Sequence, residues 1–138
     1  MRKNTTIIIL LIILGLGTSF IWRSLVQHNN IHKQMSTEIC FDSDVLCLGT
    51  LLYNCEYAVI FKYTNTGKIP LSITDVRPYS DCIYANWDKH TINPGEHNEI
   101  IIVFRPDSWG SFSKSIKVHY GASGGTKILK ICGNITMN

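Results

Sequence analysis

Five cysteines are the residues of this sequence that are most able to do chemistry: Cys40, Cys47, Cys55, Cys82 and Cys132. In an exported domain such thiols tend to oxidise, and an odd number leaves at least one of them unpaired. Five choices of the free cysteine, each with three pairings of the others, give 15 arrangements of two disulfides. The spacing selects none of them, so all five remain candidates for a disulfide or a reactive thiol.

A zinc site is one specific function that these residues could support. It would take three ligands from Cys40, Cys47 and Cys55, and a fourth from His90 or His97. The intervals between the cysteines are unlike those of zinc knuckles or zinc ribbons. We therefore expect no metal site, and no other cofactor.

A thiol enzyme is the second chemistry. Cys82 would be its nucleophile, with one of the same two histidines as the base. Asp88 or Glu96 would then orient that base. Such parts occur by chance in a chain of this length, and no nucleophile elbow, zinc-protease motif, phosphate-binding loop or dinucleotide fingerprint is present. We predict that the protein is not an enzyme, with an exported thiol-dependent enzyme or redox protein using Cys82 as the alternative.

Glycine and proline mark the turns that must position any such site. Asn93-Pro94-Gly95 suits a type II turn, in which Pro94 fixes φ and Gly95 takes the left-handed conformation. Gly67 can reverse the chain with a positive φ, and Gly110 ends a segment rich in turn-forming residues. Since each has a sufficient backbone reason, we assign structural roles to Gly67, Pro94, Gly95 and Gly110.

Between these turns, apolar and polar residues alternate with a period of two, as in strands with one buried face. The clearest case is segment 111–120, in which Phe112, Ile116 and Val118 alternate with polar residues. No helical period is long enough for a crossover connection, which excludes parallel βαβ folds. We predict an all-β, immunoglobulin-like antiparallel sandwich of about seven strands, near residues 45–52, 56–65, 71–77, 82–87, 98–105, 111–120 and 127–136.

The first segment differs in kind from the rest. Residues 7–14 are all isoleucine or leucine, and nothing charged lies between Lys3 and Arg23. As a helix, residues 5–22 would span roughly 27 Å, close to the hydrocarbon thickness of about 30 Å. Positive charge before the apolar run keeps the N-terminus cytoplasmic. We predict a retained transmembrane signal anchor at 1–23, a stalk at 24–39 and the sandwich domain at 40–138. The alternative is a cleaved signal peptide and release into the periplasm.

Composition narrows the class of partner. With 45% hydrophobic and 17% charged residues, the chain is not of the disordered class. Two of its 13 Lys and Arg residues, Arg2 and Lys3, precede the apolar run, which leaves 11 basic against 10 acidic residues in the remainder. Because a nucleic-acid-binding domain needs a basic surface, we expect no nucleic-acid partner.

Aromatic residues are frequent in the predicted sandwich. They could form a stacking platform for sugar or single-stranded nucleic acid, but the cores of sandwiches also use aromatic residues. We favour packing in the core or at its rim for Tyr53, Tyr57, Tyr63, Tyr79, Tyr84, Tyr120, Trp87 and Trp109.

Several short motifs follow one another in an order that resembles a known family. They are Leu48-Gly49-Thr50-Leu51, segment 61–73 (FKYTNTGKIPLSI), Trp87-Asp88-Lys89, Ile92-Asn93-Pro94-Gly95-Glu96 and Leu129-Lys130-Ile131-Cys132-Gly133. In order and spacing they resemble the domain of unknown function 1573 family, from about Val45 to Ile135. The resemblance implies an Ig-like sandwich in proteins exported to the bacterial cell envelope, similar to the Ig-like domains of cilia and centrosome proteins. It implies no established activity.

One segment departs from that family. Its members commonly carry Ser-Cys-Gly-Cys-Thr before the Trp-x-Lys motif, whereas the corresponding Tyr79–Ile83 retains only Cys82. A lone cysteine can form neither a local disulfide nor a metal site by itself, so the chemistry of a Cys-x-Cys pair does not transfer.

Taken together, these features predict a membrane-tethered, non-catalytic Ig-like module that binds or scaffolds a protein partner. We expect a single-pass protein of the cell inner membrane, with its C-terminal domain periplasmic or otherwise extracytoplasmic. Strand addition at an exposed sheet edge is the expected mechanism, with Lys127–Thr136 as the candidate edge. A periplasmic assembly factor that shields client strands is a further alternative.

Overall fold

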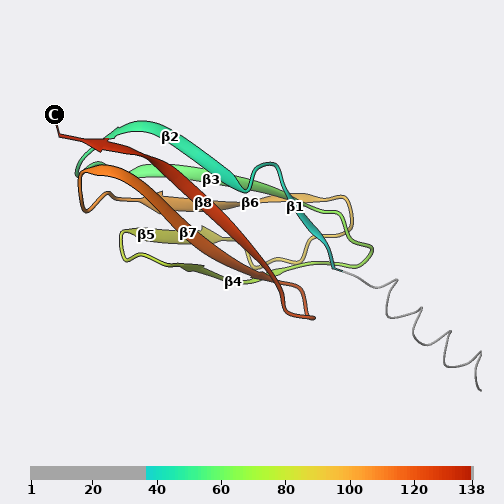
Figure 1. Ribbon diagram of the computed structural model, residues 1–138. Helices are drawn as coiled ribbons and strands as arrows, with labels where there is room; N and C mark the ends of the chain where they lie inside the picture. Colours follow the sequence, from blue (N-terminus) through green and yellow to red (C-terminus); the bar gives the residue numbers. More distant parts are fainter. Residues whose placement is uncertain (1–36, 138) are drawn as a thin grey trace, which may run out of the picture. The chain divides into compact units, whose positions relative to one another are not determined.

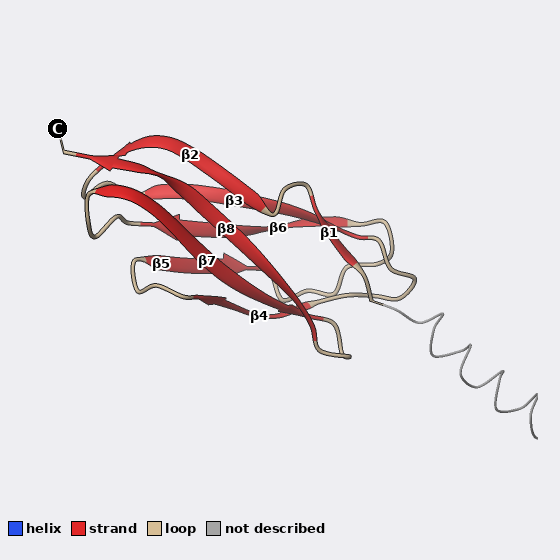
Figure 2. Ribbon diagram, viewed as in Figure 1, coloured by secondary structure: helices blue, strands red, loops and turns tan. Residues whose placement is uncertain are grey.

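The computed structural model describes residues 37–137, and this part of the chain is all-β with no helix (Figure 1, Figure 2). Apolar residues alternate with exposed ones along most of its strands, as expected for strands with one buried face. The strands are β1 (Ile39–Phe41), β2 (Val45–Leu52), β3 (Tyr57–Asn65), β4 (Ile73–Pro78), β5 (Ile83–Trp87), β6 (His97–Phe104), β7 (Gly110–Tyr120) and β8 (Gly125–Thr136).

Two four-stranded sheets pack face to face. One sheet has the order β1-β3-β6-β5 and the other the order β2-β8-β7-β4. This arrangement confirms the predicted β-sandwich and adds β1 to the seven expected strands. In β1, Ile39 and Phe41 are buried while Cys40 is exposed. Three residues are too short a run for the alternation to be visible in the sequence.

The prediction of a purely antiparallel sandwich is wrong at one place. β2 pairs in parallel with β8, and the remaining strand pairs are antiparallel. The cause is the short connection 42–44, which takes the chain from β1 in one sheet to β2 in the other. β2 then enters the second sheet beside the last strand and runs in the same direction. Its register shifts between Cys47 and Thr50.

The core lies between the sheets and is built from the inward side chains of both. Phe61 and Phe104 come from one sheet, and Ile116 and Leu129 from the other, and all four are almost completely buried. The ring of Phe104 contacts that of Phe112 across the core, with centroids 4.8 Å apart. Burying a large apolar side chain contributes roughly 1.5–3 kcal/mol, so this layer supplies most of the stability of the domain.

The turn glycines differ in conformation. Gly95 has φ +83°, and the Glu96 N–H donates to the Asn93 carbonyl at 3.0 Å, as a type II turn requires. Gly110 has φ +102° where β7 begins. Gly67 departs from the prediction, because its φ is not positive. Its N–H is instead held by the Asn65 side-chain oxygen at 3.0 Å, so asparagine sets this turn.

The described body begins at Thr37, three residues before the predicted domain boundary. The Glu38 carbonyl already accepts hydrogen bonds from the N–H groups of Thr66 and Gly67. Within residues 37–137, no helix is long and apolar enough to cross a membrane. The predicted anchor (1–23) and most of the predicted stalk (24–39) lie outside the described residues.

Candidate functional site

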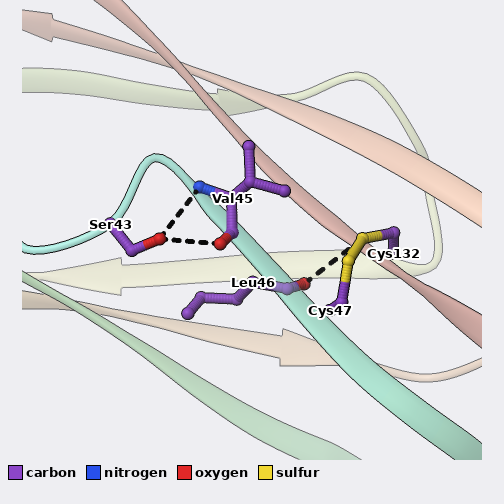
Figure 3. The surroundings of a disulfide bond; sticks show 5 residues. All are labelled: Ser43, Val45, Leu46, Cys47 and Cys132. Carbon is purple, nitrogen blue, oxygen red and sulfur yellow. Dashed lines mark hydrogen bonds between the residues drawn. A yellow bond between two sulfur atoms is a disulfide. The ribbon is translucent and has the colours of Figure 1, made fainter.

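Two of the five cysteines form a disulfide. Cys47 of β2 and Cys132 of β8 are register partners with Cα atoms 4.5 Å apart, and their sulfurs are bonded (Figure 3). The bond joins residues 85 apart in sequence. It therefore ties an edge strand to the centre of its sheet.

The other three cysteines are free. Cys40 and Cys55 are exposed, and Cys82 is buried with its sulfur 3.0 Å from the Ser80 hydroxyl oxygen. The zinc alternative fails on this arrangement, because Cys47 is already committed to a disulfide. Across residues 37–137, no three His, Cys, Asp or Glu side chains are grouped so that they could hold a metal ion.

The structure does not bring together the parts of the thiol-enzyme alternative. Cys82 lies just before β5, whereas Asp88 and His90 follow its last residue. A five-residue strand separates them by about 16 Å. His97 lies at the same far end, where its Nδ1 is 2.7 Å from the Thr64 hydroxyl oxygen. Neither histidine is positioned to take a proton from Cys82, since such a transfer needs hydrogen-bond distance.

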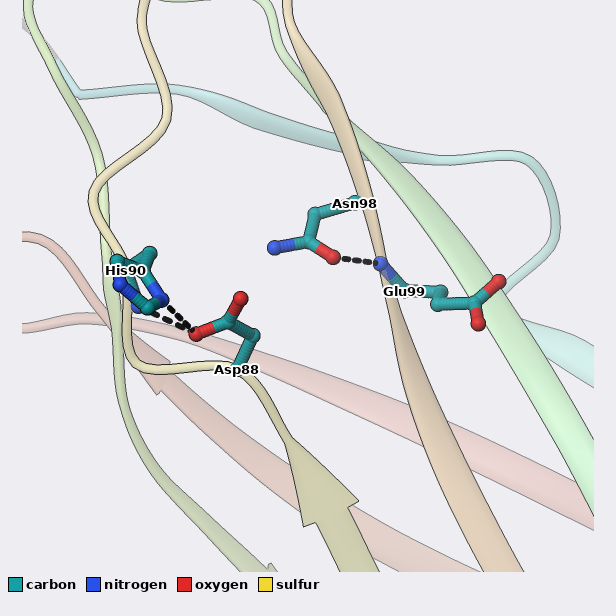
Figure 4. Close-up of polar contacts among 4 residues, drawn as sticks. All are labelled: Asp88, His90, Asn98 and Glu99. Atoms are coloured by element: carbon teal, nitrogen blue, oxygen red, sulfur yellow. Dashed lines mark hydrogen bonds and ion pairs between the residues drawn. The ribbon is translucent and has the colours of Figure 1, made fainter.

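Asp88 and His90 form a local polar turn on the surface. One Asp88 oxygen accepts hydrogen bonds from the backbone N–H of His90 at 2.9 Å and from its ring Nδ1 at 2.5 Å (Figure 4). The backbone N–H, with the ring, lowers the pKa of the Asp88 carboxyl group. In Figure 4 the Asn98 side chain points toward this turn and that of Glu99 points to the other side of β6. These contacts account for the turn without any catalytic role.

Two buried polar atoms lie on the inner face of the β1-β3-β6-β5 sheet. Among the described residues, the Tyr63 hydroxyl and the Trp87 Nε1 have no hydrogen-bond partner. Tyr63 is only 1% exposed, and its burial, together with the nearby Asp88 carboxylate, raises its pKa to about 12. An unpaired buried hydroxyl reduces stability, so these positions are not optimised for packing alone.

The expected binding edge, Lys127–Thr136, is not an edge. β8 is paired on both sides, in parallel with β2 and in antiparallel with β7. Its backbone groups are therefore already used in hydrogen bonds. The last strand of a sandwich is often taken to be peripheral, and no local pattern in the sequence shows that β2 covers it. The edges of the two sheets are β1, β5, β2 and β4.

The β2 edge is capped by two hydroxyl groups. The Asp44 carbonyl and the Tyr53 N–H bond to β8, so the adjacent residues, Val45 and Leu52, direct their backbone groups away from it. Ser43 Oγ donates to the Val45 carbonyl at 2.7 Å and accepts from the Val45 N–H at 3.3 Å (Figure 3).

The other end of β2 is capped in the same way. The Tyr57 hydroxyl accepts from the Leu52 N–H at 2.7 Å and donates to the Leu52 carbonyl at 3.2 Å. Each hydroxyl thus takes the place that a neighbouring strand would occupy. Sequence reasoning missed both residues, because a cap of this kind is defined only after the chain has folded.

Two further edges have familiar forms of protection. β1 has only three residues. β4 has a register shift between Ile73 and Asp75, and its Pro78 has no N–H to offer. An ion pair between Asp75 and Arg77 adds charge to the same strand. Short length, a bulge, proline and charge all discourage the pairing of an edge with another chain.

β5 lacks the bulge, the proline and the charge. It is short, with five residues (IYANW), but none of them is charged or proline, and its register with β6 is continuous. The Cys82 carbonyl accepts from the Arg105 N–H at 2.9 Å, so by alternation Tyr84 and Asn86 face β6. The N–H and C=O groups of Ala85 and Trp87 therefore point to the free side of the sheet.

Part of the outer face beside β5 is apolar. Ala58, Val103 and Tyr84 form one row across β3, β6 and β5. Ile60 and Ile101 lie in the next row with Asn86, and the row beyond is charged. Ile60 is 46% exposed. Apolar residues gathered on an open sheet face commonly mark an interaction surface.

Comparison with known proteins agrees with this fold. The family described as "Protein of unknown function (DUF1573)" matches residues 39–135. None of the curated proteins matches the sequence. A protein of unknown function from Porphyromonas gingivalis W83 superposes with a TM-score of 0.63 at 19% identity, over 73% of this chain and 48% of that one. The chain thus spans about half the length of that protein.

Two other solved structures are similar in fold. The ASH / PapD-like domain 7 of human CEP192 has a TM-score of 0.59 at 12% identity, over 75% of this chain and 88% of that one. The VesB protease of Vibrio cholerae has a TM-score of 0.60 at 16% identity, over 77% of this chain and 34% of that one. At such identities the likeness shows the fold alone. Since the family match covers most of the sequence and nearly all of the described sandwich, the chain belongs to the DUF1573 family.

Proposed function

We propose that this protein is a membrane-tethered, non-catalytic module of the bacterial cell envelope that holds a protein partner by strand addition at β5. The observation that carries the proposal is the contrast among the four edge strands. β1, β2 and β4 each have a feature that discourages pairing, whereas β5 offers the free backbone groups of Ala85 and Trp87. An added strand would receive its affinity from these groups.

The apolar outer face supports the same proposal and describes the partner. A strand placed beside β5 would extend the row formed by Val103 and Tyr84. It would therefore need an apolar or β-branched residue at the position facing outward, because cross-strand pairs of that kind stabilise sheets. The proposed partner is an extended segment of another envelope protein with alternating apolar side chains.

The proposed location rests on the first segment of the sequence. The uninterrupted apolar run at 7–14, with Arg2 and Lys3 before it, supports a single-pass anchor in the inner membrane and a sandwich in the periplasm. Intact mass spectrometry of protein from membranes tests retention, because a signal anchor keeps Met1. Digestion of the sandwich by protease added to spheroplasts tests its side of the membrane, and protection there would contradict the proposal.

Cross-linking tests strand addition directly. A photoreactive residue placed at Asn86, exposed on β5, should cross-link a partner in intact membranes, and one at Thr50 on the capped β2 edge should not. Ala85→Pro removes the N–H on the free side of β5 and should abolish the Asn86 cross-link. Ala85→Ser keeps that N–H and should retain it.

Folding of each variant is checked through the Cys47–Cys132 disulfide, whose presence is seen on non-reducing gels. If Ala85→Pro loses it, Asn86→Lys replaces that variant and the photoreactive residue is moved to Tyr84, which is exposed on the same strand. A lysine on an edge strand opposes pairing without removing an N–H. A cross-link that survives both substitutions, or that forms only from Thr50, would overturn the assignment to β5.

A further inference from the structure

Four aromatic side chains that the sequence places in or around the core are on the surface instead. Tyr63 is buried as expected, but Tyr84 and Trp109 are 68% and 70% exposed, and Tyr53 and Tyr79 are also exposed. Exposing an aromatic ring forgoes the free energy of its burial. The β5 edge accounts for Tyr84 alone, and neither it nor the core explains why the other three are kept in water.

Three of these residues lie at one end of the sandwich. Tyr53 follows β2, Tyr84 is near the start of β5, and Trp109 precedes β7. The register places these positions at the same end, because Tyr57 and Ile83 both pair with Phe104. It is the end at which the chain terminus is marked in Figure 1. We call it the aromatic end, defined by Tyr53, Tyr84 and Trp109.

The aromatic end is hollowed in two places. One hollow, of about 370 Å³, is lined by Tyr53 and Tyr84 with the polar residues Asp81, Arg105 and Asp107. The second is lined by Trp109, Asn134 and Met137 among others. Residues 105–110 contribute to both, so the two hollows are neighbours along one loop. Two adjacent hollows suit an elongated ligand better than a compact one.

The polar groups of the first hollow define what it can accept. The Arg105 guanidinium donates to a Glu56 carboxylate oxygen at 2.6 Å, which neutralises its charge and fixes its position. Asp81 and Asp107 form no ion pair within residues 37–137. The hollow is therefore acidic overall, which disfavours nucleic acid and other polyanions.

We infer from this geometry that the aromatic end binds a linear, uncharged oligosaccharide. Pyranose rings present apolar C–H faces that stack on tyrosine and tryptophan, and hydroxyl groups that donate to carboxylates such as Asp81 and Asp107. A few polar groups among aromatic walls is the usual composition of a small-ligand site. One sugar unit would lie between Tyr53 and Tyr84, and a later unit over Trp109. This inference shares one residue, Tyr84, with the proposed strand addition at β5, but it does not depend on the free backbone groups of that strand.

Saturation-transfer NMR on the full chain tests the inference. The probes are cellohexaose and N-acetylchitohexaose, with chitosan hexamer as a cationic probe and oligogalacturonate as an anionic one. The full chain includes the predicted membrane anchor, so it is kept in detergent micelles. The detergent must have no sugar head group, because a glucoside or maltoside would occupy the same site. We expect saturable binding of at least one neutral hexamer, and none of the anionic probe.

Matched variants locate the binding. Tyr84→Ala and Trp109→Ala should each weaken it roughly two- to tenfold, since an aromatic contact is worth roughly 0.5–1.5 kcal/mol. Tyr79→Ala is the control, because Tyr79 is 66% exposed yet lines neither hollow. Its affinity should equal that of the unmodified chain. All three side chains are largely in solvent, so the variants should fold.

Three outcomes would overturn the inference: no saturable binding of either neutral hexamer, equal weakening by Tyr79→Ala, or binding of the chitosan hexamer alone. The last would mean that the carboxylates attract a cation and that the rings take no part. Ala85→Pro distinguishes this site from the proposed protein-binding edge. It should abolish the Asn86 cross-link while saccharide binding is unchanged, so either site can fail without the other.

Discussion

The β2-β8-β7-β4 sheet has a disulfide and two hydroxyl caps at its β2 edge, whereas the β1-β3-β6-β5 sheet leaves β5 uncapped. Their outer faces differ in the same sense. Ile60, Ile101 and Val103 lie on the outer face beside β5, while Ser113, Ser115 and Lys117 lie on the outer face of the other sheet. Val45, Leu52 and Ile128 are the large exposed aliphatic side chains of that second sheet within residues 37–137.

One sheet therefore carries the features that stabilise the fold, and the other carries the features that we propose serve interaction. The capped sheet is fixed covalently, and its outer face is mixed, with serines and lysines beside three exposed aliphatic side chains. The uncapped sheet keeps an apolar strip on its outer face, an open edge and two unpaired buried polar atoms, all of which cost free energy in the isolated domain. That one layer retains such costs while the other has removed them supports the proposal that the uncapped sheet binds a partner.

Removing the disulfide should have the largest effect. In Cys47→Ser/Cys132→Ser, the unfolded chain regains the freedom of a loop of about 85 residues, which corresponds to about 4 kcal/mol of unfolding free energy. Urea denaturation followed by fluorescence measures the change. Cys55→Ser, which removes an exposed free thiol, is the control and should change little. A loss below about 1 kcal/mol would mean that β2 is held by its hydrogen bonds instead.

High pH should weaken the uncapped sheet through Tyr63. Its pKa is about 12 in the folded protein and about 10 when unfolded, so the unfolded chain releases the proton first as pH rises. Unfolding free energy should therefore fall by about 2–3 kcal/mol between pH 10 and pH 12. Tyr63→Phe should abolish this part of the loss, as measured by urea denaturation at each pH. Parallel pH profiles of both proteins would contradict it.

Removing the two hydroxyl caps should lower the unfolding free energy less than either change above. It should also increase self-association. Ser43→Ala/Tyr57→Phe leaves the free-side groups of Val45 and Leu52 to water, at a cost of about 1 kcal/mol. Because the β2 edge is then open, sedimentation velocity should show self-association at lower concentrations. Tyr79→Phe removes an exposed hydroxyl elsewhere and should do neither. An unchanged monomer would show that the disulfide alone protects this edge.

A charge on the uncapped edge should barely alter stability. Asn86 is exposed on β5, so Asn86→Lys should change the unfolding free energy by less than about 0.5 kcal/mol. The same substitution should reduce cross-linking to a partner from a photoreactive residue at Tyr84. If Asn86→Lys destabilises the isolated domain strongly, then β5 is covered in a way that its hydrogen bonds do not reveal, and the contrast between the sheets is weaker than described.

The alternation of residue types was sufficient to predict the sandwich and seven of its strands. It could not predict β1, where only Ile39 and Phe41 carry the pattern. Nor could it predict that β2 lies parallel to β8, because that pairing joins segments whose local sequences contain no information about each other. The disulfide follows from the same pairing, which is why spacing alone left 15 arrangements of two bridges open.

The candidate site was less accessible to sequence reasoning. An edge strand is defined by the neighbours that it lacks, so the choice of Lys127–Thr136 failed once β2 was found beside it. The caps from Ser43 and Tyr57 depend on hydroxyl positions that only the fold determines. The aromatic end shows the same limit, since residue type does not distinguish a buried Tyr63 from an exposed Tyr84.

The parallel pairing of β2 with β8 also determines the order in which the domain can assemble. During synthesis β2 emerges early, but its strand partner within residues 37–137 arrives about 80 residues later. Contacts this distant in sequence form slowly, and until then β2 is an unpaired strand open to other chains. The Cys47–Cys132 bond can form only after both strands are present. A molecule that contains the Cys47–Cys132 disulfide is therefore one in which β8 has already paired with β2.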